Sequence, residues 1–206
     1  MKKLAILLGV FALTLQFSSC KSETKKETKP EVEAPKSYAF SLKKATNEVN
    51  FTAYKTTEKV PVKGMFKTVK IVNGGEGDTV KEAINGAEFS IPIGSIETND
   101  SSRNLKIQTF FFQVMEATGT LKGKLFLDDD TKGHADFIMN GVTQKLPFTY
   151  SIADKVFTMD ATMDINLWNG QAAIESLNTA CKALHTGADG VSKTWNEVAI
   201  NIVSKF

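Results

Sequence analysis

A long alternation of apolar and polar residues, between Lys155 and Trp168, constrains the fold of this chain more than any other feature. One side of it carries Phe157, Met159, Ala161, Met163, Ile165 and Leu167, and the other carries Thr158, Asp160, Thr162, Asp164 and Asn166. Successive side chains of a strand point to opposite faces, so the pattern predicts a strand with one buried face. Typical strands have roughly 5–6 residues. A strand of this length favours a large twisted sheet or a barrel.

Shorter alternations recur through the rest of the chain. They cover residues 49–54, 87–93, 119–127, 145–152 and 197–203, and residues 60–72 are a further strand or pair of strands. Asn-Gly pairs, which accept positive φ angles, lie between several of these stretches. Asn140-Gly141 separates residues 135–139 from 142–152 and predicts a hairpin. The sequence therefore predicts an all-β, antiparallel fold, and the strand length favours a barrel over a sandwich because closure removes exposed edges.

Three segments have the pattern of short helices. Thr79 to Glu82 matches a capping box, and Asp100 is placed to cap a helix over residues 101–108. Residues 171–185 repeat apolar side chains at helical spacing, among them Cys181. We therefore expect Cys181 to be buried.

The first 36 residues do not resemble a folded domain. A basic start and an apolar run over residues 4–17 match a secretory signal peptide over residues 1–19. Ser18-Ser19-Cys20 is similar to the lipidation signal of bacterial lipoproteins, and ordinary signal cleavage is the alternative. Residues 20–36 are rich in Lys, Glu, Thr and Pro and predict a disordered tether. We expect an exported protein of the periplasm or cell envelope, anchored to a membrane through Cys20, with a folded domain over residues 37–206.

Charge and residue supply exclude several functions. The chain has 25 Lys and Arg against 23 Asp and Glu, and removal of residues 1–19 takes away two Lys, which leaves 23 of each sign. A neutral balance does not predict nucleic-acid binding. The two His are 51 residues apart and the two Cys are too few for a metal cluster. Asp160 and Asp164 share a polar strand face and are expected to be solvated. We therefore expect no metal, no cofactor, no catalytic residue and no enzymatic activity.

Two segments resemble the YceI-like family of exported bacterial barrels. The first is Ser95-Ile96-Glu97-Thr98, followed by Arg103, Leu105 and Phe110-Phe111, and the second is Asn140-Gly141-Val142-Thr143. Val49-Asn50-Phe51 and Lys63-Gly64-Met65-Phe66 are similar to the opening strand and the Gly-x-Phe turn of that family. The chain departs from the family pattern at Asn104, which directly precedes Leu105, and in a longer insertion over residues 168–195. The resemblance implies an extended, lipocalin-like antiparallel barrel of about eight strands with one or two short helices and an elongated apolar cavity.

The same resemblance implies a lipid or polyisoprenoid ligand, which strand parity allows us to place. The predicted lining residues are Phe51, Phe89, Ile91, Phe110, Phe137, Phe148, Phe157, Met159 and Met163, with Arg103 and Trp168 at the mouth. The expected partners are this ligand and the membrane reached by the lipid anchor, with a homodimer left open. The alternative is a barrel filled by its own side chains, which acts as a surface interaction or scaffold module. Under that alternative the same residues are core.

Overall fold

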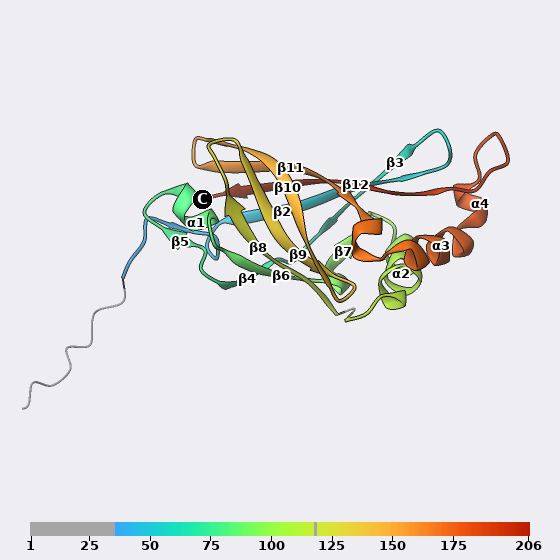
Figure 1. Ribbon diagram of the computed structural model, residues 1–206, viewed down its shortest axis with the longest axis horizontal. Helices are drawn as coiled ribbons and strands as arrows, with labels where there is room; N and C mark the ends of the chain where they lie inside the picture. Colours follow the sequence, from blue (N-terminus) through green and yellow to red (C-terminus); the bar gives the residue numbers. More distant parts are fainter. Residues whose placement is uncertain (1–35, 118) are drawn as a thin grey trace, which may run out of the picture. The chain divides into compact units, whose positions relative to one another are not determined.

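One antiparallel sheet of ten strands dominates the computed structural model, which describes residues 36–117 and 119–206 (Figure 1). Its strands, with the two of a separate small sheet, are β1 (Phe40–Ser41), β2 (Thr46–Lys55), β3 (Val60–Phe66), β4 (Lys70–Asn73), β5 (Glu76–Gly77), β6 (Glu88–Pro92), β7 (Ile96–Glu97), β8 (Thr120–Leu127), β9 (Lys132–Met139), β10 (Val142–Ala153), β11 (Val156–Asp164) and β12 (Thr194–Lys205). The large sheet has the order β4-β6-β8-β9-β10-β11-β12-β2-β3-β7, and β1 pairs with β5. The predicted signal peptide, Cys20 and residues 20–35 of the predicted tether lie outside the described residues.

A single chain segment joins the two ends of the curled sheet. Within residues 88–97, β6 pairs with β8, a 3-10 turn η1 (Ile93–Ser95) follows, and β7 then pairs with β3. If β6 and β7 are counted as one strand, because they belong to this one segment, the closed ring of paired strands has eight members. The other seven are β8, β9, β10, β11, β12, β2 and β3. The prediction of an extended antiparallel barrel of about eight strands is confirmed.

The alternation that predicted one long strand ends earlier than expected. β11 stops at Asp164, and residues Ile165–Trp168 form a 3-10 turn, η3. The Asp164 side chain accepts a hydrogen bond from the Asn166 backbone N–H, and Asn169 has a left-handed φ of 55°. The prediction of a strand as far as Trp168 was therefore wrong. Local side-chain hydrogen bonds replace the bonds between strands here, and the alternation of apolar and polar residues does not distinguish a strand from such a turn.

The helices gather at the two ends of the sheet. They are α1 (Val80–Ile84), α2 (Ser101–Phe110), α3 (Gln171–Ala180) and α4 (Lys182–His185), with a further 3-10 turn, η2 (Phe112–Val114). Thr79 forms the predicted capping box with Glu82, and Asp100 caps α2 as predicted. The helix predicted over residues 171–185 is divided at Cys181, which is buried as expected. In Figure 1, α2, α3 and α4 lie together at one end of the sheet and α1 lies at the other. None of the helices in residues 36–117 and 119–206 is both long and apolar enough to cross a bilayer.

Candidate apolar binding cavity

The inner face of the curled sheet encloses an apolar cavity of about 160 Å³. Its walls come from nine of the strands, from η3 and from the helical end: Val49, Asn50, Phe51, Ala53, Phe66, Phe89, Ile91, Ile96, Ile107, Phe111, Phe112, Leu121, Leu125, Ala135, Phe137, Met139, Leu146, Met159, Met163, Ile165, Leu177, Thr194, Trp195, Val198, Ile200 and Ile202. None of these residues is charged. Asn50 turns its side chain outward, toward the Asn201 amide oxygen at 3.5 Å, so Thr194 is the main polar side chain at the wall.

Strand register explains why these residues meet in the lumen. Met159 lies opposite Ile202 on β12, and Ile202 lies opposite Val49 on β2. Residues paired directly across antiparallel strands share a face of the sheet. Each alternating run therefore delivers its apolar side chains to the same interior, while residues such as Asp160 remain exposed.

Three phenylalanine rings pack against glycines on neighbouring strands. Phe51 pairs with Gly64, Phe89 with Gly123 and Phe148 with Gly133. A Cβ atom placed on any of these three glycines would lie 2.3–2.6 Å from the nearest atom, which is a ring carbon at Gly64 and Gly123. Glycine in a strand marks a place where another group approaches the backbone closely. The rings thus lie along the wall, and this leaves part of the lumen for the cavity.

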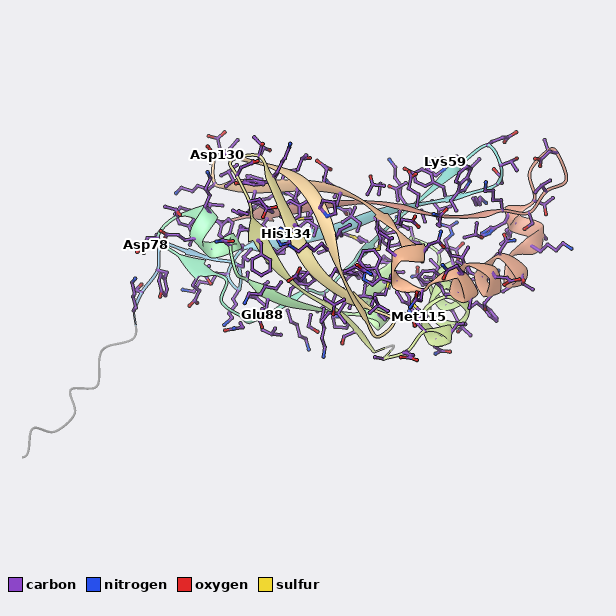
Figure 2. All side chains as sticks on the ribbon, viewed as in Figure 1. Lys59, Asp78, Glu88, Met115, Asp130 and His134 are labelled. Carbon is purple, nitrogen blue, oxygen red and sulfur yellow. The ribbon has the colours of Figure 1, made fainter. Side chains whose placement is uncertain are left out.

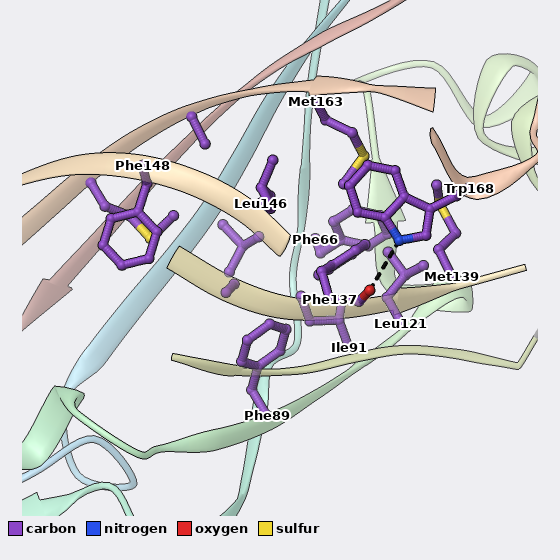
Figure 3. Packing of buried hydrophobic residues seen from close by; sticks show 14 of the residues in the cluster. Phe66, Phe89, Ile91, Leu121, Phe137, Met139, Leu146, Phe148, Met163 and Trp168 are labelled. Atoms are coloured by element: carbon purple, nitrogen blue, oxygen red, sulfur yellow. Dashed lines mark hydrogen bonds between the residues drawn. The ribbon is translucent and has the colours of Figure 1, made fainter. Parts of the chain in front are cut away.

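Six of the predicted lining residues form part of the cavity wall. They are Phe51, Phe89, Ile91, Phe137, Met159 and Met163, and most of them appear among the packed side chains of Figure 3. Their role in binding a ligand stays a prediction, since geometry shows only where they lie.

Two further predicted residues point inward but lie away from this cavity. Phe157 lines a second, smaller cavity of about 40 Å³, which shares Val49, Phe89, Ile91, Leu125 and Ile202 with the first. Phe148 is buried over Gly133 and packs edge-on against Tyr150. Parity placed both on the correct face, and their position along the barrel axis separates them from the main cavity.

The remaining three predicted positions lie outside the cavity wall, and a role for them in binding stays a prediction. Phe110 is 39% exposed at the end of α2, and its neighbours Phe111 and Phe112 line the cavity instead. Arg103 lies on the exposed side of α2, where it bonds to the Thr98 carbonyl and pairs with Asp100. Strand parity does not apply to these residues because the segment is helical.

Trp168 belongs to the core and not to the mouth. Its side chain is fully buried, and the indole N–H donates to the Phe137 carbonyl at 2.9 Å (Figure 3). The 3-10 turn η3 turns it inward at the end of β11.

The helical end supplies lining residues that were not predicted from the sequence. Ile107 and Phe111 come from α2 and its C-terminus, Leu177 from α3 and Trp195 from β12. The helical apolar spacing that includes Leu177 was the available signal, and it indicated a buried face without showing what that face covers. These residues are partly exposed, so the cavity reaches the surface at this end.

A hydrogen-bonded polar cluster lies beside the open end of the cavity. His185 Nδ1 is 2.7 Å from Thr194 Oγ1, and the Thr194 hydroxyl donates to the Asn178 amide oxygen at 3.1 Å. Burial lowers the pKa of His185, and the positive charges of Lys55 and Lys106 lower it further. His185 is therefore neutral near pH 7.

Residues 36–117 and 119–206 contain no group of three or more His, Cys, Asp or Glu side chains placed to hold a metal ion. His134 on β9 contacts Asp128 at 2.8 Å and stacks on Phe126. Figure 2 shows His134 away from the helical end of the sheet. A wider hollow of about 660 Å³ lies on the outer face along Asp160 and Asn201, but it is more open and its wall includes charged side chains. The inner cavity is the better candidate site because ligand pockets are concave and mostly apolar.

A curled antiparallel sheet around an apolar lumen defines a lipocalin-like barrel. The chain belongs to the YceI-like family, since the model of the YceI-like domain matches residues 40–206. A search of curated proteins gave no match.

Several solved structures are similar to this chain. A polyisoprenoid-binding domain from Saccharophagus degradans, implicated in plant cell wall breakdown, has 15% identity and a TM-score of 0.56 and covers 78% of this chain and 94% of its own. BcnA of Burkholderia cenocepacia has 17% identity and a TM-score of 0.48, and the match covers 77% of this chain and 94% of BcnA. The YCEI protein of Campylobacter jejuni has 18% identity and a TM-score of 0.43, and the match covers 68% of this chain and 84% of that protein.

Proposed function

We propose that this protein is a non-enzymatic carrier that binds a long-chain lipid or polyisoprenoid in the inner cavity. The observation that carries the proposal is a cavity inside the barrel whose lining residues are almost all apolar and include no charged side chain. Burial of an apolar chain there contributes about 0.8 kcal/mol per CH₂ group. Affinity then comes from the chain length of the ligand, and no reacting group is needed. The polyisoprenoid-binding domain of Saccharophagus degradans, which shares the fold, supports the choice of ligand class.

The volume of the cavity implies that it widens around its ligand. A cavity of about 150 Å³ holds a molecule of the size of benzene, whereas pockets for larger ligands have about 300–1,000 Å³. The inner cavity, with its volume of about 160 Å³, therefore accommodates only part of a long-chain ligand. Met139, Met159 and Met163 line the wall, and methionine side chains rearrange easily. We infer that a chain enters at the helical end and displaces these side chains and Phe111.

The small volume also favours a second candidate function. A barrel filled mainly by its own side chains would act as a surface interaction or scaffold module, which is the alternative hypothesis from the sequence. The two functions differ in one measurable property, which is whether a lipid occupies the lumen.

Organic extraction of the purified protein followed by mass spectrometry tests the carrier function. We expect a stoichiometric lipid, and a rise in melting temperature when a polyprenol is added to delipidated protein. Met159→Trp places bulk in the cavity and should abolish both effects. Leu167→Trp adds a similar bulk at a side chain that is 54% exposed on η3 and should preserve them. A clean extract and no thermal shift would support the scaffold module.

We further propose that lipidated Cys20 anchors the protein in the cell envelope. The apolar run over residues 4–17 and the small residues before Cys20 support this anchor. Cys20→Ser should move the protein from the membrane fraction to the soluble fraction and remove acyl groups from its intact mass. Cys181→Ser is the matched control, because its buried thiol should not affect fractionation. An unchanged distribution of the Cys20→Ser protein would contradict the anchor.

A further inference from the structure

Two lysines that form no ion pair within the described residues lie beside the helical end of the cavity, next to lining residues but outside the wall itself. Lys55 ends β2 and pairs in register with Thr194, the polar residue of the wall. Its ammonium group donates to the Leu184 carbonyl at 3.0 Å and makes no ion pair within the described residues. Lys106 precedes the lining residue Ile107 on α2 and likewise has no ion pair in that part of the chain.

The two lysines act on the same small region between α2, α4 and β12. Burial raises the pKa of the Cys181 thiol, and the positive charges of Lys106 and Lys55 oppose this rise. The same two charges lower the pKa of His185, which bonds to Thr194. Both side chains therefore feel two positive charges that come from different elements. Because the pKa of His185 is lowered, His185 adds little to the positive charge of the two lysines.

The nearby carboxylates are occupied by other groups. Glu197 pairs with Lys59 at 2.8 Å, and Asp189 accepts a hydrogen bond from Thr57 at 2.6 Å. Asp100, which feels the positive charge of Lys106, is paired with Arg103 at 3.6 Å. A chain buried in the lumen thus places its head beside ammonium groups that form no direct ion pair with a described carboxylate. Such groups bind an anion more favourably than a neutral head.

We propose that Lys55 and Lys106 bind the anionic head of the ligand, so that the preferred ligand is an anionic amphiphile with a carboxylate or phosphate at one end of an apolar chain. This inference rests on the proposed carrier function and adds the chemistry of the head to that of the chain. Thr194 and its partner Asn178 form the polar floor between the head and the lumen.

Chain-matched ligands test the proposal on the full chain. Palmitate is compared with hexadecanol, and farnesyl phosphate with farnesol, by titration calorimetry at low salt. We expect each anion to bind about tenfold more tightly than its alcohol, and about 0.5 M NaCl to reduce this difference because salt screens exposed charges. An effect seen for farnesyl phosphate alone identifies phosphate as the head, and an effect in both pairs identifies the negative charge itself.

Variants of the two lysines separate a head site from a general loss of folding. The double variant Lys55→Gln/Lys106→Gln should abolish the preference for anions and leave the affinity for both alcohols unchanged. Lys55→Arg, which keeps the charge, should retain the preference. Lys182→Gln removes an exposed charge from α4 and is the matched control, with no effect expected.

Three results would overturn the inference. The first is equal affinity for anions and alcohols in the unaltered protein. The second is a parallel loss of both in the double variant, which would indicate a structural role for the lysines. The third is no binding of any of the four ligands, which would overturn the carrier function and this inference together. Binding of the alcohols without a preference for the anions leaves the carrier function intact and refutes only the head site.

Discussion

Gly64→Ala tests whether the phenylalanine rings lie along the barrel wall because glycines face them. The φ angle of Gly64 is not in the left-handed region, so alanine fits the backbone. Its Cβ would lie 2.3 Å from Phe51 Cζ and 2.9 Å from Thr98 Cγ2. The Phe51 ring is the more mobile neighbour and lines the cavity. We expect the new methyl group to push the ring into the lumen.

The expected loss of stability follows from two opposing effects. Overpacking of this kind typically destabilises by about 1–3 kcal/mol. Replacement of glycine by alanine stabilises by about 0.4–1 kcal/mol, because it reduces the conformational entropy of the unfolded chain. The net loss in the free energy of unfolding should be about 1–2 kcal/mol, which corresponds to a fall of about 2–8 °C in melting temperature for a domain of this size.

A double-mutant cycle with Phe51→Ala measures the contact itself. In that background most of the clash is absent, so Gly64→Ala should cost about 1 kcal/mol less than in the unaltered protein. Urea unfolding supplies the four free energies. Gly94→Ala is the control, since a Cβ there meets nothing within 4 Å. The reasoning would be refuted if Gly64→Ala destabilised no more than Gly94→Ala, or equally with and without the ring.

Three further perturbations test the supports around the cavity. Lys67, with Asn104 and the Asn99 backbone N–H, lowers the pKa of Glu97 from 4.5 to about 2, so the stability from Glu97 is present above pH 4.5 and is lost as the pH falls toward 2. Carboxyl titration by NMR should show this pKa, and Glu97→Gln should remove the corresponding acid dependence of the melting temperature. Trp168→Phe loses the bond to the Phe137 carbonyl and some buried volume, and should lower the free energy of urea unfolding by about 2–4 kcal/mol. Asn140→Ala should lower the free energy of urea unfolding by about 1–3 kcal/mol, because Asn140 has a φ of 52° and its amide donates to the Trp168 carbonyl at 2.9 Å. An unchanged urea midpoint in either of these two variants would contradict the assigned contact.

Local patterns determined most of the barrel wall. Alternation with period two fixed which side of β11 faces the lumen, so Phe157 and Met159 were correctly placed inside. The Asn140-Gly141 pair fixed the hairpin between β9 and β10, and both residues adopt positive φ angles. The apolar spacing over residues 171–185 fixed the burial of Cys181. Each of these features depends on neighbours in sequence, which is why the sequence sufficed.

Only the tertiary structure decided how the wall closes and where the lumen widens. Closure depends on residues 88–97 pairing with both β8 and β3, which are contacts between distant parts of the chain. Parity assigns Phe148 and Met159 to the same face, yet one packs over Gly133 and the other lines the cavity. The position of a side chain along the barrel axis depends on strand register and on the residue facing it. Sequence periodicity therefore determined which side chains are inside, and three-dimensional packing determined which of them leave room for a ligand.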